Sequence, residues 1–290
     1  LLEMTSAFSI FARNGLKIDP VAITRIEDYR GNVIFEAEEQ TGERVISAEH
    51  AYLINSILSD TKARVPMFGA NSILNLSFDA AAKTGTTNDF KDNWTLGYNP
   101  DLAVGVWVGN ADNSAMENTT GVSGAAPIWA EFMTYAVPYL TDDNPSDFVR
   151  PDGIVDKVIC SLSGAEPSAY CPGQRSEVFA EDEPPLSKED DLWKIARIDT
   201  WTNLAYSSAC PGYAKDKYVL NVTDPWAIKW LTENSTGQAW VKNYWTVGTD
   251  LAFVPTQVCT ADDSRPTLIF VGLDEGQTIM ADSVDVYAVI

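Results

Sequence analysis

The chain has 290 residues and a mass of 31.8 kDa, enough for one large domain or two smaller ones. It has 41 acidic and 20 basic residues, and the formal net charge of -21 disfavours binding to nucleic acid or to an anionic membrane surface. The only histidine, His50, argues against a multi-histidine metal site or a Ser-His-Asp triad, so no metal or cofactor is predicted. No apolar run approaches the roughly 18 residues of a membrane-spanning helix.

The chain begins within a helical pattern. Apolar residues recur at helical spacing from Leu1 to Phe11, and Asn14 and Gly15 provide a good C-terminal cap. Nothing precedes this helix to cap its first turn, and residues 284–290 end the chain on an isolated strand pattern. We therefore interpret the sequence as a piece of a longer protein, with a natural short start as the alternative.

A hairpin and a second helix come next. Residues 22–36 favour a β-hairpin, because two β-branched runs flank an Arg-Gly-Asn turn. Ser47 is a plausible N-cap for a helix that has an apolar stripe on one face. Pro66 and Gly69 are expected to break the chain after this helix.

Three strands and a third helix are predicted after this break. The strands are expected at residues 80–86, 93–98 and 102–109, and the helix starts at Pro127. The last strand has apolar residues on both faces, which indicates a central sheet covered on both sides.

The composition changes near Thr141. Residues 141–191 hold 13 acidic and 4 basic residues together with several prolines, which is typical of a linker or a loosely packed surface segment. The segment after it is rich in tryptophan, at positions 193, 201, 226, 230, 240 and 245. A core role for these rings is favoured over glycan binding. Asp224 and Pro225 predict the start of a short helix there.

All four cysteines follow the start of the acidic segment, and four cysteines allow three pairings. Cys160 with Cys171 is favoured because a short loop closes easily, which leaves Cys210 with Cys259. Disulfides would indicate an oxidising, extracytoplasmic compartment. Four free thiols in a cytoplasmic protein are the alternative.

The most informative tetrapeptide is Lys83-Thr84-Gly85-Thr86, which lies on a predicted strand. The lysine ammonium and the threonine hydroxyl can hold a carboxylate through charge-assisted hydrogen bonds. Gly85 lets a peptide backbone come close, and a free strand edge could take up a substrate peptide by strand addition.

Several longer motifs accompany this tetrapeptide in the sequence. They are Lys83-Thr84-Gly85-Thr86-Thr87, Asp92-Asn93-Trp94, Gly97-Tyr98-Asn99-Pro100-Asp101-Leu102, Gly105-Val106-Trp107-Val108-Gly109-Asn110, Gly124-Ala125-Ala126-Pro127-Ile128-Trp129 and Leu2-Glu3-Met4-Thr5-Ser6-Ala7-Phe8. With them the sequence resembles the class A penicillin-binding proteins, the bifunctional peptidoglycan glycosyltransferase/D,D-transpeptidases. The resemblance is close over residues 1–140 and looser up to the first cysteine pair.

This resemblance implies a fold class and a function. The fold would be α+β, the C-terminal part of a transpeptidase domain with an antiparallel sheet covered by helices. The family cross-links peptidoglycan stem peptides and is acylated by β-lactam antibiotics. Lys83, Thr84, Gly85 and Thr86 would bind the substrate, with Lys83 catalytic and the Thr86 backbone N–H an oxyanion donor.

The sequence departs from the family pattern before Lys83. It has no Ser-x-Asn motif there, and its one Ser-x-x-Lys match, Ser59 to Lys62, lies at a predicted helix end and too close to Lys83. We therefore expect the nucleophilic serine and its lysine upstream of this sequence, after an N-terminal membrane anchor. The domain is expected on the extracytoplasmic face of the bacterial cell membrane. The missing N-terminal half of the domain is thus an expected partner, and the chain alone should be inactive.

Two other functions are weighed against this one. The first is a D,D-carboxypeptidase or β-lactamase-like hydrolase of the same fold, and the second is a non-catalytic cell-wall-binding module in the tryptophan-rich tail. Four segments are expected: residues 1–140 as the transpeptidase half, 141–192 as an acidic linker, 193–264 as an accessory segment, and 265–290 as the truncated start of an immunoglobulin-like β module.

Overall fold

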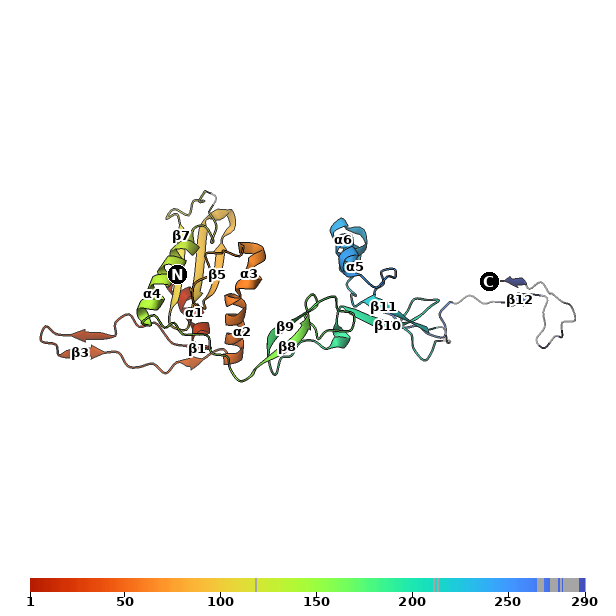
Figure 1. The fold of residues 1–290 in the computed structure, drawn as a ribbon, viewed down its shortest axis with the longest axis horizontal. Coiled ribbons are helices and arrows are strands. Elements are labelled where there is room, and N and C mark those ends of the chain that lie inside the picture. The colour runs from red at the N-terminus through yellow and green to blue at the C-terminus, as the bar shows by residue number, and fades with distance from the viewer. Residues whose placement is uncertain are drawn as a thin grey trace. The chain divides into compact units, whose positions relative to one another are not determined.

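A computed structural model describes residues 1–117, 119–210, 212, 214–264, 269–271, 276, 278 and 287–289. The chain divides into two compact units, each described by itself below. The first unit is Leu1–Asp156 with Val178–Pro184, and the second is Lys157–Glu177 with Pro185–Ile290. Figure 1 shows their helices and strands.

The first unit is built on a three-stranded antiparallel sheet of order β5-β6-β7. β5 is Ala81–Thr86, β6 is Asp92–Tyr98 and β7 is Ala103–Gly109, with a short 3-10 turn, Asn88–Phe90, between the first two. The three predicted strands are confirmed within two residues at each end. Within the described part of the chain, β5 pairs with β6 alone, so its outer edge is free.

One face of this sheet is covered by α4 (Ala125–Leu140). Trp129 is fully buried in a core shared with Ala82 and Val104, and Gly97 has no room for a Cβ because the Trp129 ring lies against it. The helix predicted from Pro127 is therefore confirmed and begins two residues earlier. Not all of its large apolar side chains are buried, since Ile128 and Phe132 are each 52% exposed.

Helices α1 (Leu2–Ala12) and α2 (Ala48–Ser59) contact the sheet through a buried polar pair. The Tyr98 hydroxyl donates to Asn55 Oδ1 at 2.7 Å, and Asn55 Nδ2 donates to the Phe11 carbonyl oxygen at 3.1 Å. Both Asn55 and Tyr98 are fully buried, and burial raises the pKa of the Tyr98 hydroxyl. Tyr98 therefore remains a neutral donor that joins the sheet to both helices.

The predicted helix caps are confirmed. Asn14 and Gly15 have positive φ angles of 52° and 90°, and the Gly15 N–H donates to the Ile10 carbonyl oxygen at 2.8 Å. Gly15 also has no room for a Cβ, because the Ile46 carbonyl oxygen lies against it. At the start of α2, the Ser47 hydroxyl accepts a hydrogen bond from the His50 N–H at 3.1 Å.

The expectation that Pro66 breaks the chain was wrong. Helix α3 (Thr61–Phe68) runs through Pro66 and ends at Gly69, which has a φ of 76°. Asp60 caps its N-terminus by accepting hydrogen bonds from the N–H groups of residues 62 and 63 at 2.8 and 2.9 Å. Proline removes one helix hydrogen bond and costs about 3 kcal/mol, and the cap offsets part of this cost.

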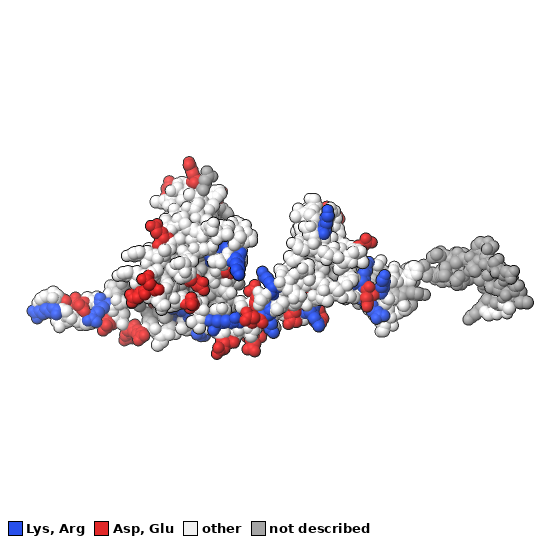
Figure 2. All heavy atoms as spheres, in the orientation of Figure 1, with Lys and Arg blue, Asp and Glu red and all other residues white. Residues whose placement is uncertain are grey.

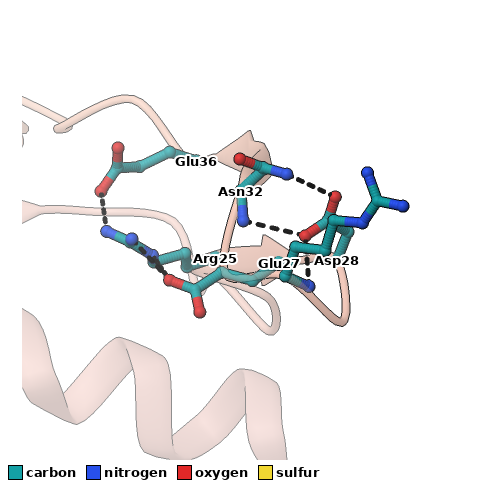
Figure 3. Close-up of polar contacts among 6 residues, drawn as sticks. Arg25, Glu27, Asp28, Asn32 and Glu36 are labelled. Carbon is teal, nitrogen blue, oxygen red and sulfur yellow. Dashed lines mark hydrogen bonds and ion pairs between the residues drawn. The ribbon is translucent and has the colours of Figure 1, made fainter.

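A separate β-ribbon joins α1 to α2. β1 (Leu16–Lys17) pairs with β4 (Glu43–Arg44), and β2 (Arg25–Glu27) pairs with β3 (Val33–Glu36), as the sequence predicted for the hairpin. Figure 3 shows how the turn is held: the Asp28 carboxylate accepts hydrogen bonds from the N–H groups of Arg30 and Asn32 and from the Asn32 side chain, at 2.8 to 2.9 Å. These bonds lower the pKa of Asp28, and the bond from the Asn32 side chain has the largest effect.

Strands also form where the sequence favoured a linker. β8 (Ile154–Cys160) and β9 (Gln174–Ala180) make a two-stranded sheet, and the boundary between the two units crosses both strands. In β8 the charged pair Asp156-Lys157 lies between apolar residues, and β9 runs from polar to apolar residues, so the charge of the segment did not exclude strands. The segment boundaries at residues 140, 192 and 264 stay predictions.

The second unit has an aromatic core. Strands β10 (Trp193–Asp199) and β11 (Ala214–Leu220) pair along their length, and α5 (Pro225–Glu233) and α6 (Ser235–Tyr244) follow; a 3-10 turn, Lys188–Asp190, precedes them. Trp193 is buried with Leu220 and Leu231, and Trp230, Trp240 and Trp245 pack around them. The core role predicted for the tryptophans is thereby confirmed for these four residues and was wrong for Trp201 and Trp226, which are 52% and 72% exposed. Asp224 caps α5, as expected.

Both favoured disulfides are present, Cys160–Cys171 and Cys210–Cys259. Their sequence separations are 11 and 49 residues. Loop-closure entropy then stabilises the fold by about 3 and about 4 kcal/mol, respectively.

The predicted immunoglobulin-like module at 265–290 lies mostly outside the described residues. Within them, β12 (Ile269–Val271) pairs antiparallel with β13 (Tyr287–Val289). The described helices include none long and apolar enough to cross a membrane.

Candidate functional site

The Lys-Thr-Gly-Thr tetrapeptide occupies the last four positions of β5, at the free edge of the sheet. Lys83 and Thr86 are exposed, while Thr84 and Gly85 are half-buried. The predicted strand position is therefore confirmed, and the tetrapeptide is open to solvent.

Strand alternation divides these side chains between the two faces of the sheet. Lys83 lies opposite Leu96 and points to the α1 face, because Leu96 and the adjoining Gly105 lie against α1. Thr84 and Thr86 point to the α4 face. A ligand that contacts the ammonium and both hydroxyls must therefore lie along the strand edge, within reach of both faces.

A pocket of about 450 Å³ borders the tetrapeptide. Its walls come from α1, β5 and β6 and consist of Met4, Phe8, Lys83, Thr84, Gly85, Thr86, Thr87, Trp94 and Leu96. On the α1 face, apolar side chains of Met4, Phe8, Trp94 and Leu96 thus surround Lys83, and the strand edge connects this face to the hydroxyls of Thr84 and Thr86.

Lys83 carries the positive charge of this pocket. Its Nζ donates a hydrogen bond to the Thr84 carbonyl oxygen at 2.7 Å, which bends the side chain along its own strand. In the described part of the chain no salt bridge involves Lys83. Figure 2 shows acidic side chains in red at several separate places on the visible surface. Because the hydrogen bond to the Thr84 carbonyl oxygen uses one of the three ammonium protons of Lys83, two remain that can donate to an anionic ligand.

The end of the pocket is held by the turn that follows β5. The Thr87 hydroxyl donates to Asp92 Oδ2 at 3.0 Å, and Asp92 Oδ1 accepts from Trp107 Nε1 at 2.8 Å. Asp89 and Phe90 in this turn have positive φ angles of 60° and 54°. Trp107 is 40% exposed and anchors this turn through its ring N–H.

Sequence reasoning missed a contact on the α4 face. The N–H of Gly121, in the turn at residues 119–124, donates to Thr86 Oγ1 at 2.9 Å, and the Gly121 carbonyl oxygen accepts from Thr95 Oγ1 at 3.2 Å. Gly121 lies 35 residues after Thr86, and no spacing pattern in the sequence connects the two.

The alternative nucleophile pair, Ser59 and Lys62, falls on two different helices. Ser59 is the last residue of α2, Lys62 is in the first turn of α3, and Asp60 between them is the N-cap. Neither residue lines the pocket beside Lys83. The geometry therefore gives no support to a nucleophile at Ser59.

Comparisons with known proteins match two parts of the chain. The penicillin-binding protein transpeptidase domain matches residues 1–134, and the C-terminal domain of penicillin-binding protein 1A matches residues 150–189. In these two parts the chain is similar to the class A penicillin-binding proteins.

The relatives are distant and considerably longer. Penicillin-binding protein 1A of Pseudomonas aeruginosa is 30% identical over 65% of the chain, and penicillin-binding protein 2D of Bacillus subtilis is 30% identical over 64%. The chain spans 28% and 27% of their lengths. The crystal structure of penicillin-binding protein 1A from Haemophilus influenzae is 27% identical, with a TM-score of 0.54 over 63% of the chain and 32% of that structure.

Proposed function

We propose that this chain provides the substrate-binding strand of a peptidoglycan D,D-transpeptidase. Strand β5 supports this, because Lys83 and Thr86 are exposed at a free sheet edge and border a pocket of about 450 Å³. Lys83 and the hydroxyls of Thr84 and Thr86 hold the terminal carboxylate of a donor stem peptide by charge-assisted hydrogen bonds. The Thr86 backbone N–H is one oxyanion donor.

In the proposed reaction, a serine outside the given sequence attacks the carbonyl carbon of the penultimate D-Ala. The serine gives up its proton, the bond to the terminal D-Ala breaks, the leaving amine takes up a proton and departs as free D-Ala, and an acyl-enzyme forms. An amine of a neighbouring stem peptide then attacks the ester, forms the cross-link and returns the proton to the serine. β-Lactams acylate the same serine. The whole protein is further proposed to carry a glycosyltransferase domain and an N-terminal membrane anchor, and to act outside the cytoplasm.

A cell-wall-binding function for the tail has little support in the geometry. Trp193, Trp230, Trp240 and Trp245 belong to the aromatic core of the second unit, which leaves, among the described tryptophans of the tail, only Trp201 and Trp226, 52% and 72% exposed, as rings that a glycan could reach. A hydrolase of the same fold is distinguished by its products, because it releases D-Ala without forming a cross-link.

Acylation by a fluorescent penicillin tests the proposal. The full-length protein that contains this chain should be labelled, and peptide mass mapping should place the adduct on a serine outside these 290 residues. The chain alone should remain unlabelled. Labelling of the chain alone at Ser59, or no labelling of the full-length protein, would contradict the proposed mechanism.

A further inference from the structure

The turn at residues 119–124 rests on the substrate-binding strand through one peptide unit. The Gly121 N–H donates to Thr86 Oγ1 at 2.9 Å, and the Gly121 carbonyl oxygen accepts both from Thr95 Oγ1 at 3.2 Å and from the Ala126 N–H at 2.9 Å. Gly121 thus connects β5, β6 and the first turn of α4.

No side chain fits at position 121. A Cβ built there would lie 2.8 Å from the Gly85 carbonyl oxygen, 2.9 Å from the Trp94 carbonyl oxygen and 3.1 Å from the Gly85 nitrogen. All three are backbone atoms of paired strands, so they cannot move aside without disturbing the sheet. Glycine is required here for close approach, and the strand it approaches is the one that carries the Lys-Thr-Gly motif.

The Gly121 hydrogen bond determines how Thr86 can act. A threonine hydroxyl has one proton to donate and two lone pairs that accept. Since the Gly121 N–H occupies an acceptor position, the Thr86 hydroxyl proton is left to donate to a ligand. The same contact holds the Gly85–Thr86 peptide, whose N–H is the proposed oxyanion donor. Preorganised donors of this kind act without reorientation during the reaction.

We propose that Gly121 is a positioning residue that aims the Thr86 hydroxyl at the substrate carboxylate, and that Thr95 supports it. The inference rests on the proposed function, in which Thr86 binds that carboxylate. It adds a specificity consequence: the preference for ligands with a free carboxylate depends on a turn outside the Lys-Thr-Gly motif.

The test compares two acylating ligands, benzylpenicillin and its methyl ester, on the full-length protein. The second-order acylation rate is measured for each, and their ratio reports recognition of the carboxylate. Gly121→Ala should lower this ratio by about tenfold, the worth of one hydrogen bond; because the added Cβ also presses on the Gly85 backbone, the rate with the ester should fall too, but by less than the rate with benzylpenicillin. Thr95→Val should lower the ratio less, because the Ala126 N–H still holds the Gly121 carbonyl oxygen.

Two controls separate positioning from a general loss of structure. Thr95→Ser keeps the hydroxyl and should retain the wild-type ratio, so the two Thr95 variants decide the matter even if Gly121→Ala does not fold. The inference is overturned if acylation by both ligands slows equally, or if the ratio of the two rates is unchanged in Gly121→Ala and Thr95→Val. If Thr86→Val abolishes the preference while those variants keep it, the proposed function stands and this inference alone fails. If the wild-type protein is acylated equally fast by benzylpenicillin and its methyl ester, both the proposed function and this inference are overturned.

Discussion

Lys83→Ala in the full-length protein should slow acylation by a fluorescent penicillin about 100-fold. Lys83 is exposed, forms no salt bridge in the described part of the chain, and borders the pocket beside β5. A hydrogen bond to a charged group contributes about 1.5 to 3 kcal/mol, and each 1.4 kcal/mol corresponds to a factor of about ten in rate. The measurement is the second-order rate constant from a time course of labelling.

Lys62→Ala is the matched control for Lys83→Ala. Lys62 belongs to the Ser-x-x-Lys match, and it lies on α3 outside the pocket. Because Lys62 does not border the pocket, its replacement should leave the labelling rate within about twofold of wild type. The fold should also be retained, since surface substitutions usually change stability by less than about 0.5 kcal/mol. A large loss with Lys62→Ala and none with Lys83→Ala would move the active site away from β5.

Asn55→Ala should lower the free energy of unfolding by about 3 to 4 kcal/mol. Asn55 is fully buried, and its loss leaves both the Tyr98 hydroxyl and the Phe11 carbonyl oxygen without the hydrogen bonds that Asn55 makes to them. Each buried polar group left unpaired costs about 1 to 3 kcal/mol, and the removed side chain also leaves a cavity. Denaturant unfolding of the full-length protein, followed by tryptophan fluorescence, measures the loss.

Tyr98→Phe completes a double-mutant cycle with Asn55→Ala. Alone it should cost about 1 to 2 kcal/mol, and the double variant should cost less than the sum of the two, because the hydroxyl and its partner are removed together. Tyr135→Phe is the control: Tyr135 is 72% exposed on α4, so the loss of its hydroxyl should cost less than about 0.5 kcal/mol. Additive costs would show that the two side chains are not coupled.

Local signals predicted much of the first unit. The N-cap at Ser47 and the positive-φ pair Asn14 and Gly15 act within a few residues, so the sequence alone locates these helix ends. The small residues Ala80-Ala81-Ala82 likewise indicate the strand that carries Lys83. The motif and its neighbours then indicated the family.

Contacts between distant residues could not be predicted in this way. Pro66 signals a break, but the Asp60 cap and the short helix length allow α3 to continue through it. Gly121 reaches Thr86 only because the sheet and α4 bring them together, and glycine is common in loops wherever a tight turn forms. The buried pair of Asn55 and Tyr98 likewise depends on two elements 43 residues apart.

A structure of the full-length protein acylated by benzylpenicillin tests most directly whether β5 binds the substrate carboxylate. We expect the carboxylate of the bound drug to lie about 2.6 to 3.2 Å, the usual range of one hydrogen bond, from the hydroxyls of Thr84 and Thr86. The drug carbonyl oxygen should accept a hydrogen bond from the Thr86 backbone N–H. A drug bound elsewhere, with its carboxylate out of reach of the free edge of β5, would contradict the proposed role of this strand.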